Sequence, residues 1–191
     1  MRRNTICMWK LFQCILRSLP IVRRVRCARS FLKILPKRRI RRLRIRSGGG
    51  WRDFAAAIGV SEETLWTSTP LPAFRLLIET YRQICNERRL AEAVAALYAY
   101  EAQALEIAAS KIDGLCRHYG VNAAQGLAYF TVHAETGKVQ RAAWRAWLES
   151  CGNDLGQDSI AAEEQVLATA GKALDALWGA LDSVQEARIE T

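Results

Sequence analysis

Two side chains in this chain combine reactive chemistry with an apolar, helical setting. Glu101 has leucine and alanine residues one helical turn away on both sides, so its carboxyl group is expected to face the core. A buried carboxylate requires a partner or a raised pKa. His133 follows two aromatic residues by about one turn. Helical bundles hold metal ions with carboxylates and imidazoles that project inward from facing helices, so the pair indicates a metal site.

Each of these residues also has a plainer explanation. Glu101 could hydrogen-bond to Tyr or Trp donors at one end of a bundle, and a lone histidine such as His133 is more often a core residue than a ligand. Lys111 stands about 80° around the helix from Glu101. It could lie beside a cavity that Glu101 faces or reach solvent, and spacing alone favours solvent. His118 could cap helix carbonyls. Cys116 has no neighbour in the sequence that would make it a nucleophile.

The elements that must position these residues are all helical. Half of the 191 residues are hydrophobic, with only four prolines, and the apolar residues recur at helical spacing after residue 50. We expect an all-α antiparallel bundle. Its helices are predicted at about residues 51–58, 61–65, 74–89, 90–118 and 122–150. A last helix is predicted to follow a loop at 153–158. In the last helix, a stripe from Val166 to Val184 that includes Leu181 is predicted to face the core.

Charge divides the chain into two parts. Sixteen of the 28 basic residues lie in residues 1–46, which contain no acidic residue, although the net charge of the whole chain is only +9. We therefore predict a basic segment at 1–50 that is disordered or foreign to the fold, and a helical domain at 51–191, with the boundary at Ser47–Gly50. Residues 1–46 could bind nucleic acid or an anionic membrane, or act as a presequence.

Hydropathy and cysteine content bear on location. No segment reaches the roughly 18 uninterrupted apolar residues of a membrane span. The six cysteines are scattered without CxxC spacing, which is typical of a reducing compartment, so a cytoplasmic protein is expected.

Several ordered motifs together resemble the haem-oxygenase-like bundle family. They are Trp51-Arg52-Asp53-Phe54-Ala55, Tyr98-Ala99-Tyr100-Glu101-Ala102-Gln103, Ala109-Ser110-Lys111-Ile112-Asp113-Gly114-Leu115, Tyr129-Phe130-Thr131-Val132-His133 and Leu174-Asp175-Ala176-Leu177-Trp178. The match covers about residues 51–186. It is similar to the PqqC-like and CADD-like branches, whose members are redox enzymes, with TenA-like proteins more distant.

The resemblance implies roles for particular residues. Glu101 and His133 match two ligands of the metal-dependent branch, and Lys111 matches a lysine implicated in the CADD-like branch, where it would be catalytic. That branch places an Asp four and a second His seven residues after the first His, but this chain has Gly137 and Gln140 there. The remaining ligands, a Glu and a His, would fall before residue 51, where the chain has neither.

These features lead to one function hypothesis and its alternatives. We expect a divergent PqqC- or CADD-like oxidoreductase-family protein without its first helices and with little or no activity. Its small-molecule substrate is unknown, and iron or manganese would be poorly bound or not bound. Residues 1–50 would then be a frameshifted or wrongly extended reading of a family gene. The alternative is a non-enzymatic helical bundle that binds a partner or regulates it, as a possible homodimer, with a basic arm that contacts nucleic acid or membrane. A TenA-like hydrolase would need an activated cysteine, and no cysteine lies in a matching motif.

Overall fold

The structure is a bundle of helices. The computed structural model describes residues 52–152 and 159–189. Three predictions lie outside these residues: the basic segment, its boundary at Ser47–Gly50, and the loop at 153–158. After a helical turn at 52–57, the helices are α5 (Glu62–Thr67), α6 (Pro72–Glu87), α7 (Leu90–Tyr119), α8 (Ala124–Gly152) and α9 (Ser159–Ile189). The prediction of an all-α fold is confirmed.

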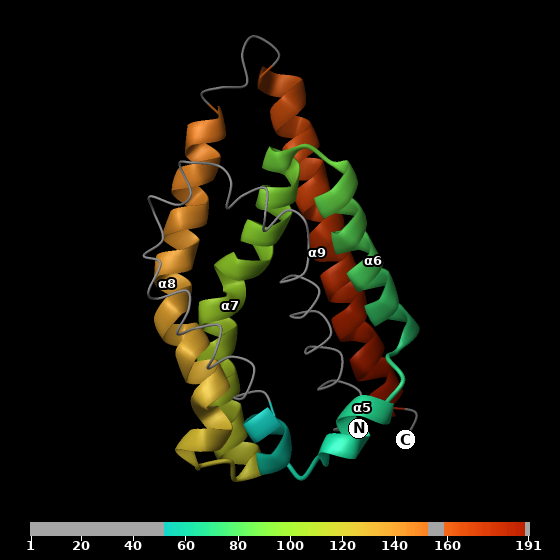
Figure 1. The fold of residues 1–191 in the computed structure, drawn as a ribbon, viewed down its shortest axis with the longest axis vertical. Helices are drawn as coiled ribbons and strands as arrows, with labels where there is room; N and C mark the ends of the chain where they lie inside the picture. The colour runs from blue at the N-terminus through green and yellow to red at the C-terminus, as the bar shows by residue number, and fades with distance from the viewer. Residues whose placement is uncertain (1–51, 153–158, 190–191) are drawn as a thin grey trace.

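The long helices lie side by side in the order α8, α7, α9 and α6 (Figure 1). Helices that follow one another in the chain run in opposite directions, as expected for an antiparallel bundle with short connections. The chain passes through α8 before it returns as α9. As a result, α9 lies antiparallel to α6 but runs in the same direction as α7 (Figure 1).

Local signals in the sequence explain where several helices begin and end. The Ser61 hydroxyl accepts a hydrogen bond of 3.1 Å from the Thr64 backbone N–H and caps α5. Gly59 and Gly120 both have positive φ, at 78° and 65°, and stop the helices that precede them. The next helix starts at Ala124, two residues after the start predicted at 122.

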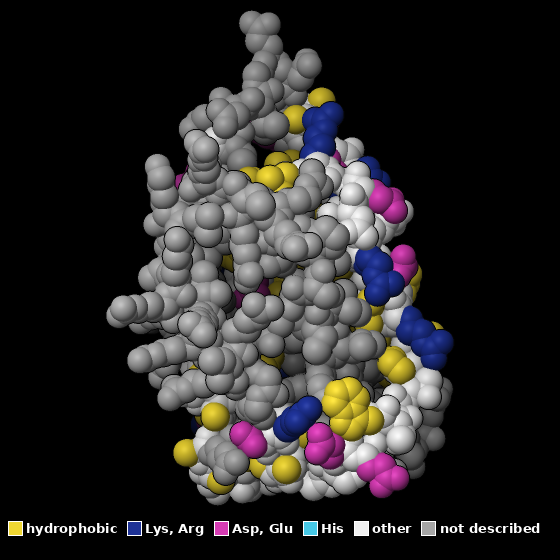
Figure 2. Space-filling model, in the orientation of Figure 1, with side chains coloured by type: hydrophobic (Ala, Val, Ile, Leu, Met, Phe, Trp, Pro, Cys, Tyr) yellow, Lys and Arg dark blue, Asp and Glu magenta, His cyan; other side chains and the backbone are white. Residues whose placement is uncertain are grey.

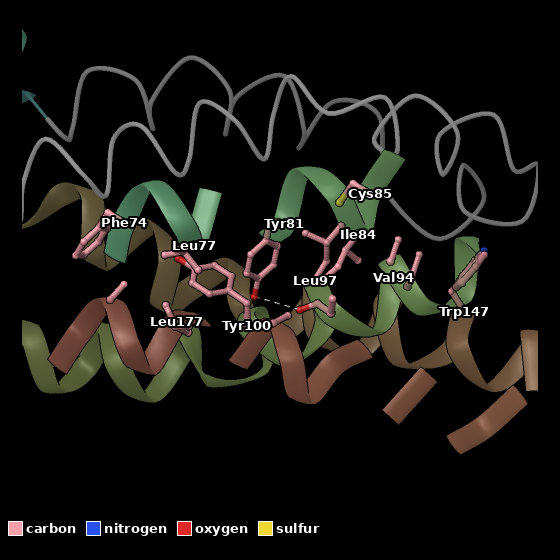
Figure 3. Packing of buried hydrophobic residues seen from close by; sticks show 14 residues of the cluster. Phe74, Leu77, Tyr81, Ile84, Cys85, Val94, Leu97, Tyr100, Trp147 and Leu177 are labelled. Carbon is pink, nitrogen blue, oxygen red and sulfur yellow. Dashed lines mark hydrogen bonds between the residues drawn. The ribbon is translucent and has the colours of Figure 1, made fainter. Parts of the chain in front are cut away.

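The core consists of two clusters. The larger lies between α6, α7, α8 and α9, and contains Leu77, Tyr81, Val94, Tyr100 and Leu177, among others (Figure 3). Six residues that recur at helical spacing form the inner face of α6, and all are buried: Phe74, Leu77, Ile78, Tyr81, Ile84 and Cys85. The stripe on α9 is buried at Ala173 and Leu177, but Leu181 is 41% exposed, so that part of the prediction was wrong.

The smaller cluster closes the other end of α7. Phe54 and Phe130 pack edge to face with ring centroids 5.0 Å apart, beside Tyr129 and Ala108. Gly126 lets α8 approach closely here, because a Cβ at this position would lie 2.8 Å from the Ala57 Cβ atom. Aromatic pairs of this kind add to the stability that burial provides.

The described surface carries charges of both signs. Basic and acidic side chains alternate along the edge formed by α5 and α6, and no continuous basic patch is visible on the described part of this face (Figure 2). The salt bridges there, such as Arg52 to Glu62 at 3.5 Å, join exposed groups, and such pairs contribute little to stability.

Candidate functional site

Glu101 lies in the middle of α7, next to the layer of aromatic side chains in the larger core cluster. Tyr100 precedes it and is 4% exposed. Tyr81 reaches in from α6 and donates a hydrogen bond of 3.5 Å from its hydroxyl to the Ala96 carbonyl oxygen (Figure 3). Glu101 is close enough for its charge to raise the pKa of Tyr81, after the larger effects of burial and of Cys85. A carboxyl group is therefore held at the edge of an apolar layer.

The Glu101 side chain is half-buried, and the protein around its carboxyl group raises the pKa of that group to about 7 by desolvation. Within residues 52–152 and 159–189, its carboxyl group makes no hydrogen bond and no ion pair. The expected hydrogen bond from a Tyr or Trp donor is not found in this part of the chain. Such a group is readily protonated near neutral pH and has both oxygens available to a proton or a cation.

Two cysteines, Cys85 beside this layer and Cys116 near the other end of α7, are the candidate nucleophiles in the described residues. Cys85 is fully buried on α6, and desolvation raises the pKa of its thiol to about 12. The Cys116 thiol is half-buried and donates to the Val121 carbonyl oxygen at 3.4 Å. Because a thiol reacts as the thiolate, the environment of Cys85 suppresses its reactivity.

Lys111 lies on the same helix as Glu101, about 15 Å further along at 1.5 Å per residue. Its side chain is exposed, as spacing alone favoured, and partial desolvation by the neighbouring protein lowers its pKa. Lys111 adjoins Ile112, which packs against the smaller core cluster. No ion pair joins Lys111 to Glu101 in the described structure. The two residues therefore belong to different levels of the bundle.

His133 lies on α8, whose position relative to α7 is fixed by a contact eight residues later. There, Arg141 donates to the Ala102 carbonyl oxygen at 3.2 Å and pairs with Glu106 at 3.3 Å. The two helices are antiparallel, so the backbone at His133 is about 12 Å further toward the end of α7. Its neighbour Ala134 packs against the smaller core cluster. His133 is thus nearer to the level of Lys111 than to that of Glu101.

The alignment of α8 against α7 also gives the levels of positions 137 and 140. Both follow His133 along one face of α8, and Gln140 directly precedes Arg141, so it is the nearest of the three to the level of Glu101. The side chains of His133, Gly137 and Gln140 lie outside the described part. By residue type, a glycine offers no side-chain ligand and a neutral amide is a poor replacement for imidazole.

The described side chains do not gather donors for a metal pair. Across the described ranges, no three His, Cys, Asp or Glu side chains come together in a way that could hold a metal ion. Glu101 supplies one carboxylate on α7, and on α8 Gly137 and Gln140 stand where the resemblance places an Asp and a His. Two metal ions bound in a bundle need several carboxylate and imidazole ligands, and the described residues do not bring such a set together.

One buried polar contact was not anticipated from the sequence. Glu92 in the first turn of α7 is 3% exposed and accepts a hydrogen bond of 2.9 Å from the Thr169 hydroxyl on α9. The start of a helix favours a negative charge. A possible signal in the sequence was the position of Glu92 between alanines at the start of a long apolar helix, where little else could cover it.

Comparison with known proteins identifies the family. Residues 50–178 match the family model described as iron-containing redox enzyme, which is a haem-oxygenase-like family. A 4-aminobenzoate synthase of Nitrosomonas europaea is 35% identical over 136 residues, which cover 71% of this chain and 53% of that protein.

Two further relatives give the same result. A 4-aminobenzoate synthase of Chlamydia trachomatis is 33% identical over 133 residues, covering 70% of this chain and 54% of that protein. The pyrroloquinoline-quinone synthase of Ruegeria pomeroyi is 30% identical over 140 residues, covering 70% of this chain and 58% of that protein. The chain spans about half the length of the curated relatives it matches. In the described residues, no helix is long and apolar enough to cross a membrane. The chain belongs to the haem-oxygenase-like family of iron-containing redox enzymes.

Proposed function

We propose that this chain is a divergent relative of the 4-aminobenzoate synthase and pyrroloquinoline-quinone synthase enzymes that has lost the dinuclear metal chemistry of its metal-dependent branch. One observation carries the proposal: on the turns of α8 that lead from His133 toward the level of Glu101, the positions four and seven residues after His133 hold Gly137 and Gln140. The loss therefore falls on the donors that would complete a site with Glu101. In this form the protein has little or no metal-dependent oxidase activity.

A weak single-metal site is the most that the remaining donors support. Glu101 and His133 are the surviving candidate ligands, and transition metals bind tightly only when several ligands surround them in a suitable geometry. The raised pKa of Glu101 weakens binding further near neutral pH, because a proton competes with the metal for the carboxylate. Iron or manganese would be held loosely by such a site. Lys111 would be the cavity residue inherited from the CADD-like branch.

The resemblance leaves room for chemistry without a metal. The PqqC-like branch is implied to oxidise its substrate without one, so the loss of ligands does not by itself remove every activity. The substrate of this chain would be a small molecule, and its place of action the cytoplasm. The reactions named for the relatives, synthesis of 4-aminobenzoate and of pyrroloquinoline quinone, are the two to assay first.

Elemental analysis tests this proposal. The full chain is expressed with iron and manganese supplied, and its metal content is compared with that of the Glu101→Ala, His133→Ala double variant. We expect well below one metal ion per chain in both proteins. A stoichiometric metal ion in the original chain that disappears in the double variant would overturn the proposal, since other side chains would then complete the site.

A second candidate function is binding of a macromolecular partner without catalysis. The observation that favours it is the set of large apolar side chains exposed on α9, among them Ile160, Leu167 and Trp178. Nucleic acid or an anionic membrane would instead engage residues 1–46, whose charge is entirely basic. Salt-sensitive binding that disappears when residues 1–46 are deleted would support that form of the hypothesis.

A further inference from the structure

Helix α9 carries a row of large apolar side chains on the side that faces away from the bundle. Ile160 is 74% exposed, Leu167 72%, Trp178 56% and Ile189 77%. They are spaced close to two or three whole helical turns apart, so all four lie within about 40° of one another around the helix. Such a row is more than folding of the domain requires, and exposed apolar patches mark contact surfaces. We call these four residues the α9 apolar row.

A row of carboxylates runs beside the α9 apolar row, about 60° away around the helix. All of its side chains are exposed, and within the described part of the chain none of them forms an ion pair. Lys172 is the only basic side chain described on α9, so the outer side of this helix carries excess negative charge. We call the row the α9 acidic row, and its members are Glu164, Asp175, Asp182 and Glu186.

A segment of the same chain has the complementary chemistry. Residues 1–46, which lie outside the described part, contain sixteen basic residues and no acidic residue. Apolar pairs such as Ile21-Val22, Phe31-Leu32 and Ile34-Leu35 lie between those basic residues. An apolar row with carboxylates along its edge fits a segment of this composition, because apolar contact supplies binding energy and opposite charge selects the partner.

The length of the segment and the place where it joins the bundle allow the contact. The described part begins at Arg52, in the helical turn at the end of the bundle where α9 also ends (Figure 1). The α9 acidic row spans about 33 Å, whereas 46 residues would span about 69 Å even if every residue were helical. The covalent link gives the segment an effective concentration on the order of millimolar at α9, so a weak contact is sufficient.

We propose that residues 1–46 dock on the outer side of α9, with their apolar side chains on the α9 apolar row and their basic side chains beside the α9 acidic row. The contact would mask the positive charge that this segment otherwise presents to nucleic acid or an anionic membrane. A basic segment of another protein fits the same chemistry but lacks the covalent link. The proposal does not depend on the metal content or the activity of the protein, so it is tested separately from the proposed function.

Zero-length cross-linking of the full chain with a carbodiimide tests the contact, because this reagent joins a lysine amine to a carboxylate only where the two groups touch. Mass spectrometry identifies the joined peptides. The lysines of the segment, Lys10, Lys33 and Lys37, are expected to couple to the α9 acidic row. Glu63 and Glu87 are exposed on α5 and α6 and serve as internal controls, and they should couple to these lysines far less.

An equal mixture of ¹⁵N-labelled and unlabelled chain shows whether the segment belongs to the same molecule, because a cross-link within one chain joins peptides of one isotope. The double variant Leu167→Ser, Trp178→Ser removes apolar contact and should lower the coupling about fivefold or more. Leu76→Ser, at a 64% exposed position on α6, is the matched control and should leave it within about twofold.

All substituted positions are exposed, and equal far-ultraviolet circular dichroism would confirm that each variant is folded. Four outcomes would each overturn the proposal. They are the absence of cross-links between the segment and α9, equal coupling to Glu63 and Glu87, cross-links that join the two isotopes as often as random pairing predicts, and coupling that is unchanged in the Leu167→Ser, Trp178→Ser variant.

Discussion

Replacing Glu101 by glutamine should stabilise the protein, and increasingly so as the pH rises. Desolvation raises the pKa of the Glu101 carboxyl group from its ordinary value of 4.5 to about 7. A tenfold change in an acid dissociation constant is equivalent to about 1.4 kcal/mol. The ionised carboxylate therefore costs the folded state about 3 kcal/mol, a cost that the neutral amide of the same shape avoids.

The direction of the pH dependence follows from whether the folded or the unfolded chain holds the proton of Glu101 more tightly. Below pH 4.5 the group is protonated in both the folded and the unfolded chain, and there is no penalty. Between 4.5 and about 7 the unfolded chain releases the proton first, so stability falls as the pH rises. Above that range the penalty is constant. The advantage of Glu101→Gln in free energy of unfolding should thus grow from about 0.5 kcal/mol near pH 4.5 to about 3 kcal/mol near pH 8.

Urea denaturation of the original chain and of Glu101→Gln, in a chelating buffer at several pH values between 4.5 and 8, measures the difference in free energy of unfolding directly. Glu87→Gln, at an exposed position on α6, is the matched control for removal of a negative charge. The reasoning is refuted if the difference between the original chain and Glu101→Gln does not change with pH, because Glu101 would then be as well solvated in the folded chain as in the unfolded one.

Three further outcomes follow from packing. Gly126→Ala should destabilise the protein by about 1–3 kcal/mol, because the new methyl group collides with the helical turn at 52–57. Gly114→Ala, in open space on α7, should stabilise it by about 0.5–1 kcal/mol. Thermal unfolding of the two variants measures these changes, and equal effects would contradict the packing described. Thr169→Val should cost about 1–3 kcal/mol by leaving the buried Glu92 carboxylate without its donor, and a change below 0.5 kcal/mol in urea denaturation would argue against that contact. Cys85 should resist iodoacetamide until the chain unfolds, and peptide mass spectrometry that finds it alkylated in the native protein would show that it is accessible.

Much of the helical framework could be predicted because its signals are local. Ser61 has a side chain suited to capping, and Gly120 has the backbone freedom that a helix end with positive φ requires. The inner face of α6 is readable from the sequence because one stripe of large apolar residues leaves a single choice of orientation.

The failures occurred where helices have apolar residues on more than one side. α9 has large apolar side chains around much of its circumference, so spacing alone placed Leu181 in the core although it is 41% exposed. Glu92 was missed for the related reason that its burial depends on α9, which is 77 positions away at Thr169. Contacts between distant segments leave no periodic trace in the sequence.

Of the candidate site, the apolar surroundings of Glu101 could be predicted from the sequence, but the register of His133 against Glu101 could not. Glu101 was expected to face apolar surroundings, and the structure gives it a desolvated carboxyl group. The offset of His133 from Glu101 depends on how α8 slides along α7, which Arg141 sets through its contacts with Ala102 and Glu106. Periodicity describes the face of one helix and carries no information on the offset between two.

Restoring the missing donors tests the central claim most directly. The original chain and a Gly137→Asp, Gln140→His variant are stripped with chelator, incubated with iron(II) or manganese(II), and analysed for bound metal after gel filtration. If the loss of donors beside Glu101 abolished metal binding, the original chain should retain well below one ion per chain. The variant should retain about one and lose it when Glu101→Ala is added. A stoichiometric ion in the original chain, or a variant that binds no more than the original, would contradict the account.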